Sequence, residues 1–94
     1  MDQLKEARAE IDRIDREMAG LFEARMAAVR RVAEYKAAKG LPVLDRSREA
    51  EVITGHTAFL QDAALAPYYQ EFLRQQMAIS RQFQADLLGL DPNT

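Results

Sequence analysis

Two cationic residues of one long helical stretch, Arg25 and Lys36, are the first candidates for chemistry. Arg25 occupies a heptad position whose other members are all apolar, and a guanidinium there is costly to desolvate unless it meets an anion or reaches solvent. Lys36 follows eleven residues later, so it lies on nearly the same face of a helix, about 16 Å further along its axis. Taken alone, Arg25 is explained by a side chain that reaches solvent. Together, the two side chains can hold an anion the size of a substituted six-membered ring.

A third cation, Arg8, lies too far away to join them within one chain. Seventeen residues separate Arg8 from Arg25, which is roughly 25 Å along a rigid helix. If Arg8 contributes to the same kind of site, it does so across a dimer whose long helices run antiparallel. Spacing alone favours a simpler interpretation, a surface pair with Asp12 four residues on.

Further polar residues come in two groups. Asp45 and Glu49 suit the cap and first turn of a helix, but Arg48 opposes the helix dipole unless it has an acidic neighbour or a ligand. Ser80 and Gln84 are one turn apart and interrupt an apolar stripe with neutral hydrogen-bonding groups. A satisfied polar network in the core is the alternative interpretation of this second pair.

Other kinds of site are absent from the sequence. There is no cysteine and one histidine, His56, so we predict no metal site and assign His56 no chemistry. There is no glycine-rich phosphate loop, no nucleophile with a histidine partner and no catalytic carboxylate pair. A net charge of −2 argues against nucleic-acid binding. The remaining cations and neutral donors suit a reaction without covalent or proton-transfer steps on a substrate that bears two carboxylates, with electrostatic and positional catalysis.

Three helices should position these residues, which makes the fold all-α. The stretch from Leu4 to about Ala38 lacks proline and is rich in strong helix formers, and Gly40 with Pro42 should end it. A second helix is predicted from Arg46 to Leu60 after an Asp45 cap, and a third from Pro67 to Leu88. The last residues, "GLDPNT", should form a loose tail.

The chain is predicted to be a single domain, residues 1–94, that needs a partner subunit. A first helix about 50 Å long exceeds what the remaining residues can cover, and a chain this short buries only a modest core alone. Phenylalanines at helical spacings are predicted to be core, namely Phe22, Phe59, Phe72 and Phe83. No apolar run reaches the length of a membrane span, and "MDQLKEARAE" is not laid out as a signal peptide, so we expect a cytoplasmic protein without membrane contact.

The segment "LKEARAEIDRIDREMAGLFEARMAAVRRVAEYKAAKGLPVLDRSREAEVI", from Leu4 to Ile53, resembles the N-terminal half of the all-helical (type II) chorismate mutases. The family pattern is L-x-x-x-R-x-x-I-D-x-I-D, then L-x-x-x-R, a lysine eleven residues on, and P-V-x-D-x-x-R-E. Every spacing is kept. The resemblance is diffuse from Thr54 to Ile79 and sharpens at Ser80 and Gln84.

The resemblance implies an intertwined homodimer with two equivalent sites, each lined by one subunit and capped by Arg8 of the other. It implies that Arg8, Arg25 and Arg48 bind the two carboxylates of the substrate with help from Ser80. Lys36 and Gln84 would donate hydrogen bonds to the ether oxygen whose bond breaks. Glu49 and the backbone at Asp45 would hold the ring hydroxyl. Among these residues, the catalytic set would be Lys36, Gln84, Arg25 and Glu49.

The implied reaction is the Claisen rearrangement of chorismate to prephenate in phenylalanine and tyrosine biosynthesis, a concerted shift with no cofactor. An isochorismate pyruvate-lyase is similar in fold, but the complete "DRSRE" segment matches the mutases. An aminodeoxychorismate mutase stays open, since Glu49 could hold an amine as readily as a hydroxyl. A catalytically silent helical dimerisation or regulatory module is the non-enzyme alternative. The sequence also leaves open an association with a larger aromatic-pathway enzyme.

Overall fold

Three α-helices and one short 3₁₀ turn make up the protein, as described by a computed structural model of residues 2–94. The helices are α1 (Gln3–Lys39), α2 (Arg46–Thr57) and α3 (Ala66–Leu88), and the 3₁₀ turn η1 (Ala63–Leu65) leads into α3. The predicted all-α class is confirmed.

The ends of α1 follow from its flanking residues. The Asp2 carboxylate accepts the backbone N–H of Leu4 at 2.9 Å, which satisfies a free donor of the first turn. Gly40 ends the helix in the left-handed conformation, with φ of 65°, which a residue with a side chain adopts only with strain. The chain therefore turns sharply into the loop that leads to Asp45.

Helix α2 ends three residues before the predicted Leu60. The backbone N–H groups of Phe59 and Leu60 each bond to the carbonyl three residues back, the pattern of a tight turn and not of an α-helix. The Thr57 hydroxyl also donates to Ile53 O at 2.5 Å. Local turn bonds therefore replace the last predicted turn of this helix.

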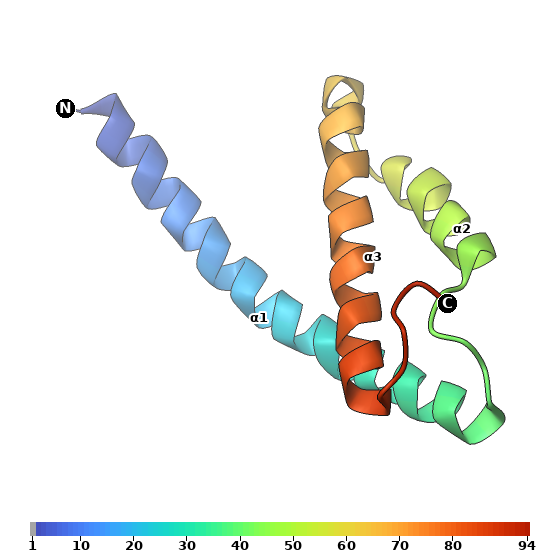
Figure 1. Cartoon of the computed structure of the whole chain (residues 1–94). Coiled ribbons are helices and arrows are strands. Elements are labelled where there is room, and N and C mark those ends of the chain that lie inside the picture. Colours follow the sequence, from blue (N-terminus) through green and yellow to red (C-terminus); the bar gives the residue numbers. More distant parts are fainter. Residues whose placement is uncertain (1) are drawn as a thin grey trace.

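Helix α3 is the centre of the fold, because it packs against both other helices. Val52 of α2 and Leu73 and Met77 of α3 form a small buried cluster. In Figure 1 the C-terminal third of α1 crosses α3, while the N-terminal part of α1 runs away from the other helices. The chain is correspondingly elongated, with extents of 57 × 25 × 17 Å.

The prediction that the phenylalanines form the core is wrong for a single chain. Phe59, Phe22 and Phe72 are 73%, 49% and 45% exposed. Phe83 is half-buried, with the Arg30 guanidinium 5.3 Å from its ring centre. Helical spacing correctly groups apolar residues on a face, but a chain this small has too few elements to cover each face.

The C-terminal residues also differ from the predicted loose tail. The backbone N–H of Leu44 donates to the carbonyl of Thr94 at 3.0 Å, and Figure 1 shows the tail returning beside the loop between α1 and α2. The tail thus lies against the segment that carries Asp45.

No helix in the described part of the chain combines the length and the apolar character needed to cross a bilayer.

Candidate active site

A polar cavity of about 260 Å³ lies where all three helices and the α1–α2 loop meet. Helix α1 lines it with residues four, seven and eleven positions after the first, and α2 and α3 line it at similar helical spacings. The lining residues are Arg25, Val29, Val32, Lys36, Val43, Asp45, Arg48, Glu49, Val52, His56, Met77, Ser80, Arg81 and Gln84.

Seven of the eight site residues predicted from the sequence line this one cavity, and Arg8 does not. Arg8 is exposed on the N-terminal part of α1, the part that diverges from the other helices in Figure 1. In the folded chain, Arg8 therefore does not reach the cavity of its own subunit, as its separation along the helix predicts. Which subunit or surface Arg8 serves stays a prediction.

Arg25 links α1 to α3 through Ser80. Its Nη1 donates to Ser80 Oγ, and that hydroxyl donates its own proton to the Gln76 carbonyl at 2.9 Å. Burial lowers the pKa of Arg25 from its ordinary value, but a guanidinium stays charged at neutral pH. The Ser80 hydroxyl donates its hydrogen bond to a carbonyl, which is not a general base, so the site contains no activated serine nucleophile.

Lys36 is held against the α1–α2 loop. Its Nζ donates to the Val43 carbonyl at 2.6 Å. Burial lowers the pKa of Lys36, while the nearby carboxylates of Asp45 and Glu49 oppose that shift. The ammonium is thus partly desolvated, which strengthens its attraction for an incoming anion.

Asp45 and Arg48 mark the start of α2 at the edge of the cavity. The Asp45 carboxylate caps the helix by accepting the Arg48 backbone N–H at 3.0 Å, as predicted. The Arg48 side chain pairs with Glu51 at 3.4 Å, and both side chains are more than 60% exposed. Such a surface pair contributes little, so a bound anion can compete for Arg48.

Gln84 is buried, and its amide is only partly satisfied. Its Nε2 donates to the Ser80 carbonyl at a long 3.3 Å, and its Oε1 is buried without a hydrogen-bond partner. An unpaired polar atom in the interior is costly unless something else binds there. Nε2 carries a second N–H, so Gln84 can offer the cavity a neutral donor as well as this unpaired acceptor.

Arg81 and His56 line the cavity; from the sequence, Arg81 was not noticed and His56 was assigned no chemistry. The Nε of Arg81 lies 2.9 Å from Glu49 Oε2, in an ion pair between α3 and α2. His56 follows Glu49 by seven residues, a spacing that places both on one face of α2 and was a usable signal. The Glu49–Arg81 pair spans 32 positions, and no local pattern indicates such a contact.

The charges around the cavity favour a dianion. Arg25, Lys36, Arg48 and Arg81 face it with Asp45 and Glu49, which leaves two positive charges unmatched. The whole chain has a net charge of −2, so this excess is local. A concave wall of one sign concentrates ligands of the opposite sign.

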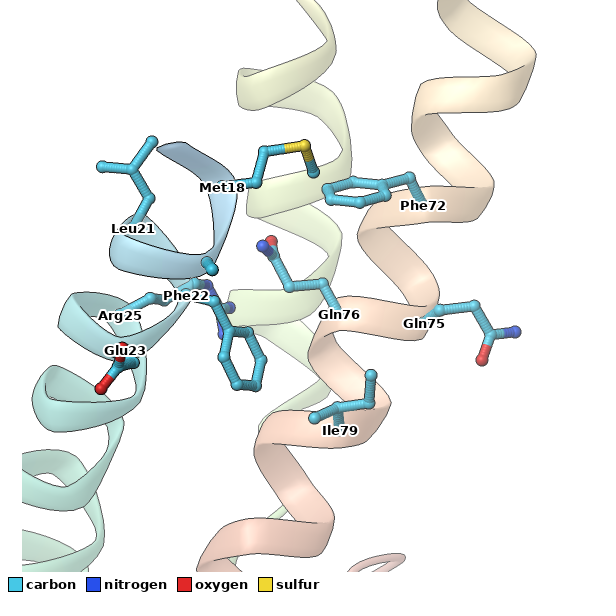
Figure 2. Close-up of a pocket in the computed structure, with 10 residues that line it drawn as sticks. Met18, Leu21, Phe22, Glu23, Arg25, Phe72, Gln75, Gln76 and Ile79 are labelled. Carbon is cyan, nitrogen blue, oxygen red and sulfur yellow. The ribbon is translucent and has the colours of Figure 1, made fainter. Parts of the chain in front are cut away.

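A second hollow, of about 580 Å³, is almost entirely apolar and lies between α1 and α3. Figure 2 shows Met18 and Phe22 of α1 and Phe72 and Ile79 of α3 projecting into the space between the helices. Arg25 lines both hollows. The polar cavity is the better candidate site for a charged ligand, because it gathers four cationic side chains, whereas Arg25 is the one cation among the described residues that line the largely apolar groove.

Comparison with known proteins matches residues 7–85 to the sequence model of the family described as chorismate mutase type II. The chain is 29% identical over 97 residues to a bifunctional chorismate mutase/prephenate dehydratase of Aquifex aeolicus, covering 95% of the chain and 27% of that protein. It is 31% identical over 88 residues to the T-protein of Haemophilus influenzae, covering 88% of the chain and 23% of that protein.

The chain thus spans about a quarter of the length of these curated relatives. No solved structure matches the chain significantly. The family match covers most of the chain and includes every predicted site residue. The chain therefore belongs to the type II chorismate mutase family.

Proposed function

We propose that the protein is a chorismate mutase, which rearranges chorismate to prephenate for phenylalanine and tyrosine biosynthesis. One observation carries the proposal: a cavity with two unmatched positive charges, neutral donors and no activated nucleophile. Chorismate bears two carboxylates and one breaking ether bond, which fits such a wall. The family match supports the same conclusion.

Catalysis in this proposal begins with positioning. Arg25 and Arg48, with Arg8 of a second subunit and Ser80, hold the two carboxylates so that the flexible ether side chain folds over the ring. The Arg25–Ser80 contact supports this role, since it fixes the guanidinium before substrate arrives. Because the bound substrate is already oriented, it loses less entropy when it reaches the transition state.

The second part of catalysis is stabilisation of the transition state. In the concerted Claisen shift the ether C–O bond breaks while a C–C bond forms, and negative charge builds on the departing oxygen. Lys36 and Gln84 donate hydrogen bonds to that oxygen, while Glu49 and the backbone at Asp45 hold the ring hydroxyl. Donors aimed at a developing charge stabilise the transition state more than the ground state. The concerted shift needs no cofactor.

We further propose that residues 1–94 form one domain that works as an intertwined homodimer. Apolar side chains along α1 are widely exposed, Leu4 at 56%, Ile11 at 53% and Leu21 at 69%. The apolar groove of Figure 2 continues this surface between α1 and α3. A second copy that covers both would also bring its Arg8 to the cavity. A cytoplasmic location stays a prediction.

The experiment that tests the activity is to incubate purified protein with chorismate and identify the product by chromatography and mass. Prephenate is expected. Pyruvate release from isochorismate would instead indicate a lyase. A transition-state mimic, a bicyclic dicarboxylate, should raise the melting temperature of the enzyme; no shift and no turnover would favour a silent helical module.

The pH dependence of turnover follows from Lys36, which must be protonated to donate. Because burial lowers its pKa, kcat/KM should be full below that pKa and fall as pH rises through it, below the ordinary lysine range. The bound dianion favours the ammonium, so the corresponding fall in kcat should come at higher pH. Initial rates across an alkaline pH series measure both.

Lys36→Arg is the matched control for this profile, since a guanidinium does not titrate in the same range. Its residual activity should lack the alkaline fall. A wild-type kcat/KM that stays constant up to the ordinary lysine pKa would contradict the assignment of the alkaline fall to Lys36.

A further inference from the structure

Arg81 lies between Ser80 and Gln84 in the sequence of α3 and lines the same cavity. The proposed mechanism gives it no role. Its Nε lies 2.9 Å from Glu49 Oε2, and the two side chains are only 21% and 25% exposed. The Nε is buried and has no aligned hydrogen-bond partner. The attraction to Glu49 is therefore mainly Coulombic, in a place where water screens it less than on the open surface.

A second, longer contact joins the guanidinium to the C-terminal tail. Its Nη1 donates to the Asn93 side-chain oxygen at 3.4 Å, and the neighbouring Thr94 carbonyl accepts the Leu44 backbone N–H. Arg81 is thus placed between α2 and the C-terminal tail. Two elements besides α3 therefore contact its guanidinium, α2 through Glu49 and the tail through Asn93.

This pairing changes what Glu49 can bind. A free carboxylate would accept a hydrogen bond from a hydroxyl and would attract an ammonium group more strongly still. Here the charge of Glu49 is already matched by Arg81, and Lys36 lines the same cavity. A neutral hydroxyl can still donate to the remaining lone pairs of the carboxylate. An ammonium group would lose its water and meet neighbouring positive charges.

We propose that Arg81 is a positioning residue that fixes and neutralises Glu49, and thereby selects a substrate with a ring hydroxyl over the analogue with a ring amine. This inference rests on the proposed mutase function. It assigns a hydroxyl, and not an amine, to the ring position that the sequence left open. Arg81 does not touch the reacting bond in this account; it acts through Glu49.

The first test compares kcat/KM for chorismate with kcat/KM for the analogue that carries an amine in place of the ring hydroxyl. Wild type should prefer chorismate, and Arg81→Met should reduce the ratio about tenfold, the scale of one well-placed charge interaction. Arg81→Lys keeps the positive charge and should retain most of the preference. A merely structural role would lower both activities and leave the ratio unchanged.

The outcomes separate the inference from the function on which it rests. A wild-type protein that turns over neither substrate overturns the proposed function. A wild type that converts chorismate, with the same ratio in Arg81→Met as in wild type, overturns the inference alone. A wild type that prefers the amine overturns both.

A second test needs no substrate. Urea unfolding of Arg81→Met, Glu49→Gln and the double variant forms a double-mutant cycle, in which the pair should show a coupling of about threefold or more in the folding equilibrium constant. The matched control is Arg74 with Glu71 on the same helix, 3.3 Å apart but 55% and 60% exposed, where coupling should be near zero. Additive effects of Arg81 and Glu49 would overturn the inference whatever the turnover.

Discussion

Replacing Lys36 with alanine is expected to lower kcat/KM for chorismate by about a hundredfold or more, the usual cost of removing one donor aimed at a developing negative charge. Lys36 is the charged donor proposed for the departing ether oxygen. It is held toward the cavity by its 2.6 Å hydrogen bond to Val43 O, and its partial burial strengthens its field. Most of the loss should appear in kcat, since the charge on oxygen develops only as the bond breaks.

Lys39→Ala is the matched control for this variant. It removes the same charge from the same helix, but Lys39 is exposed and its Nζ lies 5.9 Å from the ring centre of Tyr35, outside the cavity. We expect near-normal turnover. Because Lys36→Ala also removes a bond to the loop, its melting temperature should be measured beside its rate. Near-normal turnover in a folded Lys36→Ala protein would remove the central role given to this residue.

Mixing two inactive variants should restore activity if Arg8 completes the site of the partner. Arg8→Ala and Lys36→Ala are each expected to be nearly inactive. In a mixed dimer, the site built by the Arg8→Ala subunit keeps Lys36 and receives an intact Arg8 from its partner. Random reassortment after mild denaturation and refolding should therefore recover about a quarter of wild-type activity, because half of the dimers are mixed and each has one intact site.

Arg25→Ala mixed with Lys36→Ala is the control for subunit exchange. Both residues line the same cavity of one chain, so every site in every mixed dimer carries one lesion, and no activity should return. Activity in this control mixture would contradict the shared-site arrangement. So would a lack of activity in the Arg8 mixture when subunit exchange has been demonstrated. A monomer in sedimentation measurements would do the same.

Local patterns were sufficient to predict the helices and the cap residues. Gly40 ends α1 in the left-handed conformation and Asp45 caps α2, because both depend on backbone bonds within a few residues. The end of α2 was placed three residues late, since propensity does not distinguish a last α-turn from a tight turn.

Spacing also placed several of the cavity residues on common helix faces. Arg25 and Lys36 share a face of α1 because eleven residues are close to three turns, and Ser80 and Gln84 share a face of α3 for a similar reason. Helix periodicity determines the direction in which each side chain leaves the helix axis. Residues on one helix could therefore be grouped by face before the helices were placed relative to each other. Which of these faces meet around one cavity is a property of helix packing.

The sequence by itself determined the three helices, the cap residues Gly40 and Asp45, and seven polar residues that prove to line one cavity, because these depend on local bonding and helical period. Only the tertiary structure decided that Arg81 pairs with Glu49, that the tail lies against the α1–α2 loop, and that the phenylalanine faces stay largely exposed in one chain. Contacts between residues far apart in sequence depend on how whole helices cross, and the residue pattern within one helix does not indicate which part of another helix packs against it.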